Sequence, residues 1–277
     1  MTPSLMLILK ITLTPILVAG MSLAAKRFGP TIGGLLMGLP WMTGPILLFL
    51  ALEKGSPFAI NASIGVLIAV AAIAGFLLAY AWAARRFSWP ISLVAASMMF
   101  WSIGCGLTYV PMGVIEGAAL GAGALLAAFL LMPRLAEPEG PRALPWWDIP
   151  MRMIATAAMV AAISFAADRI GARLSGVVAS FPVITTVVGC FTHARWGAAA
   201  VVRILTAMTL SLMAFVAFFT VTALGLERLD IGTAFGLATL SGICVSALII
   251  SIARRRHAQA RTAEAAKAPA GRQPLSR

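Results

Sequence analysis

The sequence predicts an all-α polytopic membrane protein with about nine transmembrane helices. Three observations predict this class: 61% of the 277 residues are hydrophobic, only 11% are charged, and long apolar runs recur along the chain. A soluble domain is about a quarter charged, and a helix of about 20 apolar residues spans the hydrocarbon core of a bilayer. The composition therefore excludes soluble and fibrous classes of protein.

The predicted membrane spans are separated by short joints that carry charges or prolines. The cluster Arg254–Arg256 predicts a cytoplasmic C-terminus, because cytoplasmic segments are enriched in Lys and Arg. An odd number of crossings then places the N-terminus outside, in a bacterial inner membrane. The spans are expected at 4–24, 31–52, 58–82, 90–109, 113–133, 151–167, 174–192, 198–224 and 231–252.

An internal repeat relates the two halves of the chain. A shift of 142 residues aligns Lys10–Gly55 with Arg152–Gly197 without a gap, and 13 of the 46 positions are identical. The repeat predicts one four-helix unit at 1–110 and a second at 151–253, with residues 111–133 as a linker helix. A single crossing between the units inverts the second one, as in many secondary transporters. The alternative is a parallel duplication in which 111–133 does not cross the membrane.

Prolines interrupt the second and seventh predicted spans at matching positions, Pro40 and Pro182. A proline inside a helix removes a backbone hydrogen bond, and protein or cavity water must satisfy the freed carbonyl. Broken helices at matching places in two halves are typical of a transporter's binding site. The alternative is a packing kink with small residues. The candidate substrate-binding residues here are Pro40, Trp41, Thr43, Pro182 and Thr185.

Three ionisable residues complete the candidate site. Lys10 and Arg152 occupy matching positions, each four residues before a matched threonine, and two cations on such faces favour an anionic substrate. The alternative is that both side chains snorkel to the membrane surface. Glu116 lies inside the linker helix, where a carboxylate indicates function unless it sits at the interface.

The remaining polar residues do not indicate an enzyme. The sequence shows no nucleophile–base pair, metal-ligand spacing or phosphate loop, so we expect no cofactor, no metal and no catalysis. Residues 134–150 are expected to form a cytoplasmic loop. The tail 254–277 carries seven basic residues and one acid and is predicted to be disordered, with anionic lipid rather than nucleic acid as its partner. Each of the three cysteines lies in an apolar run and is expected to pack there.

The stretch around the second proline carries a family resemblance. Residues 176–182 read Gly-Val-Val-Ala-Ser-Phe-Pro, Arg195-Trp196-Gly197 ends fifteen residues past that proline, and Pro40 and Gly55 keep the same spacing. This pattern resembles the small GlpM-type inner-membrane proteins, which are single four-helix units. The resemblance implies a fused, double-length relative. The family's histidine seven residues past the proline is replaced here by Leu47 and Gly189.

Together these patterns favour a small secondary transporter or exporter. We expect its substrate, an unidentified small solute, to bind near the midplane between the second and seventh spans. The alternative is a non-transporting membrane partner or assembly factor with a tightly packed midplane, whose function resides in the 134–150 loop or the tail.

Overall fold

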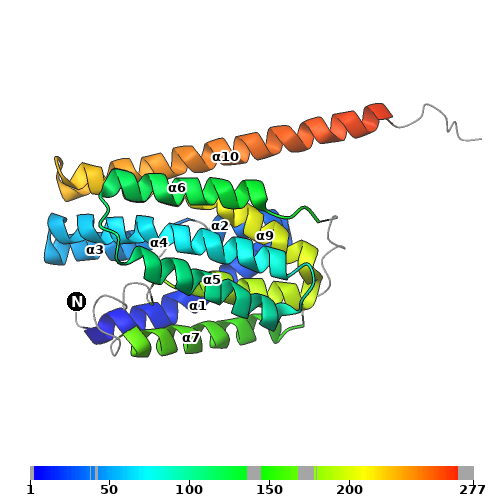
Figure 1. Ribbon diagram of the computed structural model, residues 1–277, viewed down its shortest axis with the longest axis horizontal. Helices are drawn as coiled ribbons and strands as arrows, with labels where there is room; N and C mark the ends of the chain where they lie inside the picture. Colours follow the sequence, from blue (N-terminus) through cyan, green and yellow to red (C-terminus); the bar gives the residue numbers. More distant parts are fainter. Residues whose placement is uncertain are drawn as a thin grey trace, which may run out of the picture.

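The computed structural model describes residues 3–37, 39–40, 43–135, 145–167, 178 and 180–267. This part of the chain is a bundle of helices that lie side by side (Figure 1), and it contains no strand. In chain order the helices are α1 (Pro3–Phe28), α2 (Pro30–Met37), α3 (Thr43–Lys54), α4 (Ser56–Ala83), α5 (Trp89–Leu107), α6 (Val114–Leu131), α7 (Asp148–Ala167), α9 (Val183–Leu226) and α10 (Ile231–Lys267).

The predicted class of helical membrane protein is confirmed. Within the described residues, six helices are long and apolar enough to cross a membrane: α4, α5, α6, α7, α9 and α10. Large apolar side chains such as Met98, Leu130 and Ile154 are exposed on the outside of the bundle, where lipid rather than water accommodates them. The count of about nine crossings stays a prediction, because residues 168–177 and 179 lie outside the described part.

Helix α9 is 44 residues long, which would be about twice the thickness of a membrane if it were straight. It bends at Gly197, whose φ of 81° and ψ of −178° are non-helical. The segment before the bend folds back along the segment after it, since the Thr185 hydroxyl reaches Met208 Sδ at 3.2 Å. Two predicted spans therefore meet in this one element.

Helices α4 and the second segment of α9 form the centre of the bundle. Phe76, Leu67 and Ile204 are fully buried there. Helices α5 and α6 pack on α4, and α10 packs on α9. The linker helix α6 approaches α4 closely, because a Cβ added to Gly121 would lie 2.9 Å from the carbonyl oxygen of Leu67. Small residues of this kind let helix backbones approach in membranes.

Helices that are one repeat apart run in opposite directions. In Figure 1, α1 runs from left to right and α7 from right to left, and the same opposition holds for α5 and α10. The contacts agree for the first pair, because Arg152 at the start of α7 reaches Ser22 near the end of α1. The arrangement of two complete inverted repeats stays a prediction.

Two predicted boundaries are wrong. Helix α7 begins at Asp148, inside the segment 134–150 that was expected to be a loop. Helix α10 continues to Lys267, although disorder was predicted from residue 254. Alanine, arginine, glutamine and lysine dominate that extension, and all four are strong helix formers. Residues 268–277 lie outside the described part, and the contact of the tail with anionic lipid stays a prediction.

Candidate functional site

The first helix break is centred on Pro40, which lies between the end of α2 at Met37 and the start of α3 at Thr43. Proline has no N–H to donate to the Leu36 carbonyl, so Leu39 donates to it instead, at 3.4 Å. The neighbouring carbonyl of Leu35 accepts a hydrogen bond from the hydroxyl of Ser211 on α9. The protein itself thus satisfies a carbonyl that lipid would leave unpaired.

The second break, at Pro182, repeats the backbone pattern of the first. Phe181 donates to the Val178 carbonyl at 3.2 Å, and Thr186 donates to the Pro182 carbonyl at 2.9 Å. These bonds match those from Leu39 to Leu36 and from Gly44 to Pro40, the latter 3.0 Å long, at a shift of 142 residues. The two prolines therefore end and restart their helices in the same way.

Aromatic side chains pack against both breaks. A Cβ added to Gly44, just after the first break, would lie 3.3 Å from the ring of Phe218. At the second break, Phe181 meets the edge of Phe76 at a centroid distance of 5.9 Å and stacks on Trp101 with planes 18° apart. Phe76 and Phe218 are themselves one repeat apart, so each half supplies the matching phenylalanine to the break in the other half.

The structure does not bring together those of the other predicted site residues that it describes. Thr43 is exposed, whereas its repeat partner Thr185 is buried and bonded to Met208. Glu116 is exposed in the first turn of α6, and α6 begins at the opposite end of the bundle from α7 (Figure 1). Trp41 and the side chain of Lys10 lie outside the described part.

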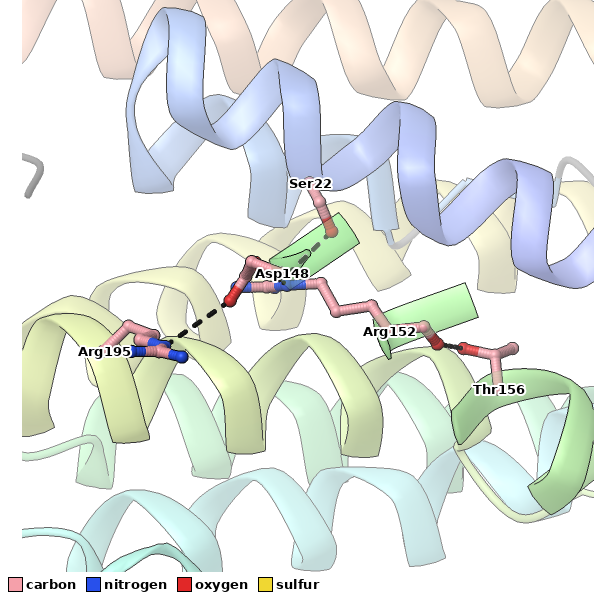
Figure 2. A network of polar contacts seen from close by, with 5 residues as sticks. All are labelled: Ser22, Asp148, Arg152, Thr156 and Arg195. Carbon is pink, nitrogen blue, oxygen red and sulfur yellow. Dashed lines mark hydrogen bonds and ion pairs between the residues drawn. The ribbon is translucent and has the colours of Figure 1, made fainter. Parts of the chain in front are cut away.

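Arg152 is the predicted site residue with the most informative surroundings. Its side chain is 2% exposed, so the snorkelling alternative is wrong for this residue. Nε donates to Asp148 Oδ2 at 2.7 Å, and Nη1 lies 3.4 Å from Ser22 Oγ on α1. The guanidinium carbon lies 5.1 Å from the ring centroid of Phe191 on α9. Three helices therefore enclose one arginine (Figure 2).

A second arginine completes a buried ionic cluster, which we define as Asp148, Arg152 and Arg195. Arg195 Nε lies 3.6 Å from Asp148 Oδ1, and its side chain is 35% exposed while Asp148 is fully buried. The Arg195 guanidinium stacks over Trp147 at 4.4 Å. Figure 2 shows Asp148 lying between the two arginines. The cluster is thus buried on the side of Arg152 and reachable on the side of Arg195.

Formal charge and hydrogen bonding are both unbalanced in the ionic cluster. Two arginines face one carboxylate, which leaves one excess positive charge, and the start of α7 adds the positive end of a helix dipole. Asp148 Oδ1 and Arg152 Nη2 are buried without a hydrogen bond to any described residue. Buried polar groups are ordinarily paired, so the cluster has free binding capacity.

Sequence reasoning missed Asp148 and Arg195. Asp148 was assigned to the loop 134–150, and Arg195 to a joint between spans. The available signal was the four-residue spacing of Asp148 and Arg152, which is the spacing of an ion pair on a helix. No local pattern connects Arg195 to them, because that contact depends on the way α9 packs beside α7.

Comparisons of this chain with protein-family models, with curated proteins and with solved structures find no match. The fold therefore defines a class, that of helical multi-pass membrane proteins. A relationship to GlpM-type proteins stays a prediction.

Proposed function

We propose that this protein is a small secondary transporter or exporter of the bacterial inner membrane, built from two inverted four-helix repeats joined by α6. The pair of helix breaks at Pro40 and Pro182 carries the proposal. The breaks share their backbone hydrogen bonds and are packed by the matching phenylalanines of opposite halves. In such proteins, broken helices free backbone groups to bind a solute near the midplane, and one repeat moves against the other.

The repeats have further support from backbone geometry. Gly55 and Gly197 occupy matching positions and adopt nearly the same backbone angles, with φ values of 86° and 81°. Helices α5 and α10 begin at Trp89 and Ile231, again 142 residues apart. The antiparallel directions of α1 and α7 are those that an inverted second repeat requires. A parallel duplication would give these two helices the same direction.

The inverted arrangement predicts that equivalent surface positions lie on opposite sides of the membrane. Arg86 and Arg228 are one repeat apart and both exposed. In a variant without native cysteines, we expect Arg86→Cys to react with an impermeant maleimide only from the cytoplasmic side, and Arg228→Cys only from the outside. Labelling of both from one side would contradict the inversion.

Transport requires that the region of the breaks opens to water. Thr185 is 2% exposed and lies three residues past Pro182. In the same cysteine-free background, we expect Thr185→Cys to react with a small charged thiosulfonate in membrane vesicles. Some of the protein molecules should react with reagent on the inside, and others with reagent on the outside. Thr222→Cys is a matched control, because Thr222 is also buried on α9 but lies far along the helix from the break.

The same measurement tests the alternative, a non-transporting membrane partner or assembly factor. The stacking of Phe181 on Trp101 and its edge contacts with Phe76 and Phe100 favour that alternative, because they fill one side of the second break. If Thr185→Cys is as unreactive as Thr222→Cys from both sides, the breaks are packing features and the transporter proposal fails.

A further inference from the structure

We propose that the ionic cluster of Asp148, Arg152 and Arg195 binds a small oxyanion that also carries a hydrogen-bond donor, such as dihydrogen phosphate. The binding site does not depend on transport. Only its role as the entry site of a transported substrate rests on the transporter function proposed above.

The first argument is charge. Arg152 and Asp148 are both at most 1% exposed and balance each other. The excess positive charge therefore belongs to Arg195, whose side chain is 35% exposed and can meet an anion that enters from solvent. Among the described residues, the cluster contacts Ser22, Phe191 and Trp147, and none of these three is acidic. A bound monoanion would neutralise the excess positive charge of the two arginines.

The second argument is the position of the unpaired groups. An arginine that meets a carboxylate side-on donates from both Nε and Nη2 to its two oxygens. Here only the bond from Nε to Asp148 Oδ2 forms, at 2.7 Å, while Nη2 and Asp148 Oδ1 both lack a hydrogen bond. These two groups belong to the same edge of the pair, and Arg195 approaches that Oδ1 at 3.6 Å.

The chemistry of the ligand follows from these three groups. Arg152 Nη2 requires an acceptor, the partly exposed Arg195 offers further donors beside it, and guanidinium groups match the oxygens of phosphates and carboxylates. Asp148 Oδ1 requires a donor. Dihydrogen phosphate supplies both, whereas sulfate supplies acceptors only. The same combination occurs in a phosphatidylglycerol headgroup, which joins a phosphate to glycerol hydroxyls.

Access to the ionic cluster is from the side of Arg195. That side chain is 35% exposed, and Trp147, on which it stacks, is 38% exposed. An anion would therefore pass Arg195 before it reaches Arg152. This geometry makes Arg195 the residue whose replacement removes the ligand contact with the least disturbance of the buried pair.

Binding is tested by the thermal shift of the full-length protein in detergent, titrated with sodium phosphate at pH 6 against sodium chloride of equal ionic strength. We expect phosphate to raise the unfolding temperature, and sulfate to do so less. Arg195→Gln should weaken phosphate binding by about tenfold, since one charge-assisted hydrogen bond is lost. Arg228→Gln is the matched control and should leave binding unchanged.

The lipid source is distinguished in nanodiscs of phosphatidylcholine with and without phosphatidylglycerol. If the headgroup is the ligand, phosphatidylglycerol stabilises the wild type but not Arg195→Gln, and added phosphate has no further effect. If free phosphate is the ligand, it stabilises the protein in both nanodiscs. The proposal is overturned if neither phosphate nor phosphatidylglycerol gives a shift that Arg195→Gln reduces. The Thr185→Cys labelling is independent of this result, so failure of the site and failure of the transporter proposal are distinguishable.

Discussion

Replacement of Asp148 by alanine is expected to lower the free energy of unfolding by about 3–5 kcal/mol, because it leaves a buried arginine without its partner. Asp148 is fully buried and holds Arg152 through a bond of 2.7 Å. Without the carboxylate, Arg152 would be buried next to a second arginine with no counter-charge among the described contacts. The measurement is equilibrium unfolding in mixed micelles, followed by tryptophan fluorescence or by the loss of helical circular dichroism.

A double variant separates the cost of an unpaired charge from the loss of a useful contact. Asp148→Leu combined with Arg152→Met removes both charges and keeps the branched shape of the first side chain and the unbranched shape of the second. Exchanges of buried ion pairs for apolar side chains are often neutral or stabilising. We therefore expect the double variant to be more stable than Asp148→Ala. Equal destabilisation by the two variants would mean that the ion pair itself, not the orphaned arginine, determines stability here.

Much of the fold could be predicted from the sequence because the bilayer imposes simple rules. Apolar length predicts membrane helices, and a proline without an N–H predicts a break, as at Pro40 and Pro182. The repeat matches Gly55 with Gly197, and the two residues adopt nearly the same backbone angles. These features depend on local chemistry, so a single stretch of chain is enough to reveal them.

The candidate site was harder to predict because it depends on contacts between distant segments. Thr43 and Thr185 are identical in the repeat, yet only Thr185 is buried against a partner, Met208. The residue that matches Met208 in the first half is Val66, which offers no acceptor. A repeat predicts shared backbone, but it does not predict side chains that differ between its two copies.

The charged residues diverge in the same way. The positions that match Asp148 and Arg195 in the first half are Met6 and Glu53. The first half therefore lacks both the carboxylate of Asp148 and the positive charge of Arg195. Alignment of the halves indicated Lys10 and Arg152 as a symmetric pair of cations. The structure instead pairs Arg152 with Asp148, which in turn lies near Arg195. The first half has neither of these two partners, so the proposed anion site has no equivalent around Lys10.

Replacement of both Gly55 and Gly197 by alanine is expected to be the second most damaging change. Their φ values of 86° and 81°, with ψ of 168° and −178°, lie in a region that only glycine adopts readily. Any other residue forced into this region costs about 1–3 kcal/mol. Steric clash does not explain this cost. An added Cβ at Gly197 would meet nothing within 4 Å, and one at Gly55 would make only an ordinary contact of 3.7 Å.

The expected result of the double variant is a lower unfolding temperature and a loosened bend in α9. Gly197 allows the first segment of α9 to fold back, which places Thr185 beside Met208 at 3.2 Å. A straighter bend separates these two residues, so Thr185→Cys should become more reactive in the Gly197→Ala background.

Gly65→Ala and Gly236→Ala are matched controls, since both lie within helices where an added Cβ meets nothing within 4 Å. Alanine is the better helix former there, so the controls should keep or slightly raise stability. If all of these alanine variants behave alike, then the left-handed backbone at Gly55 and Gly197 does not hold the two bends.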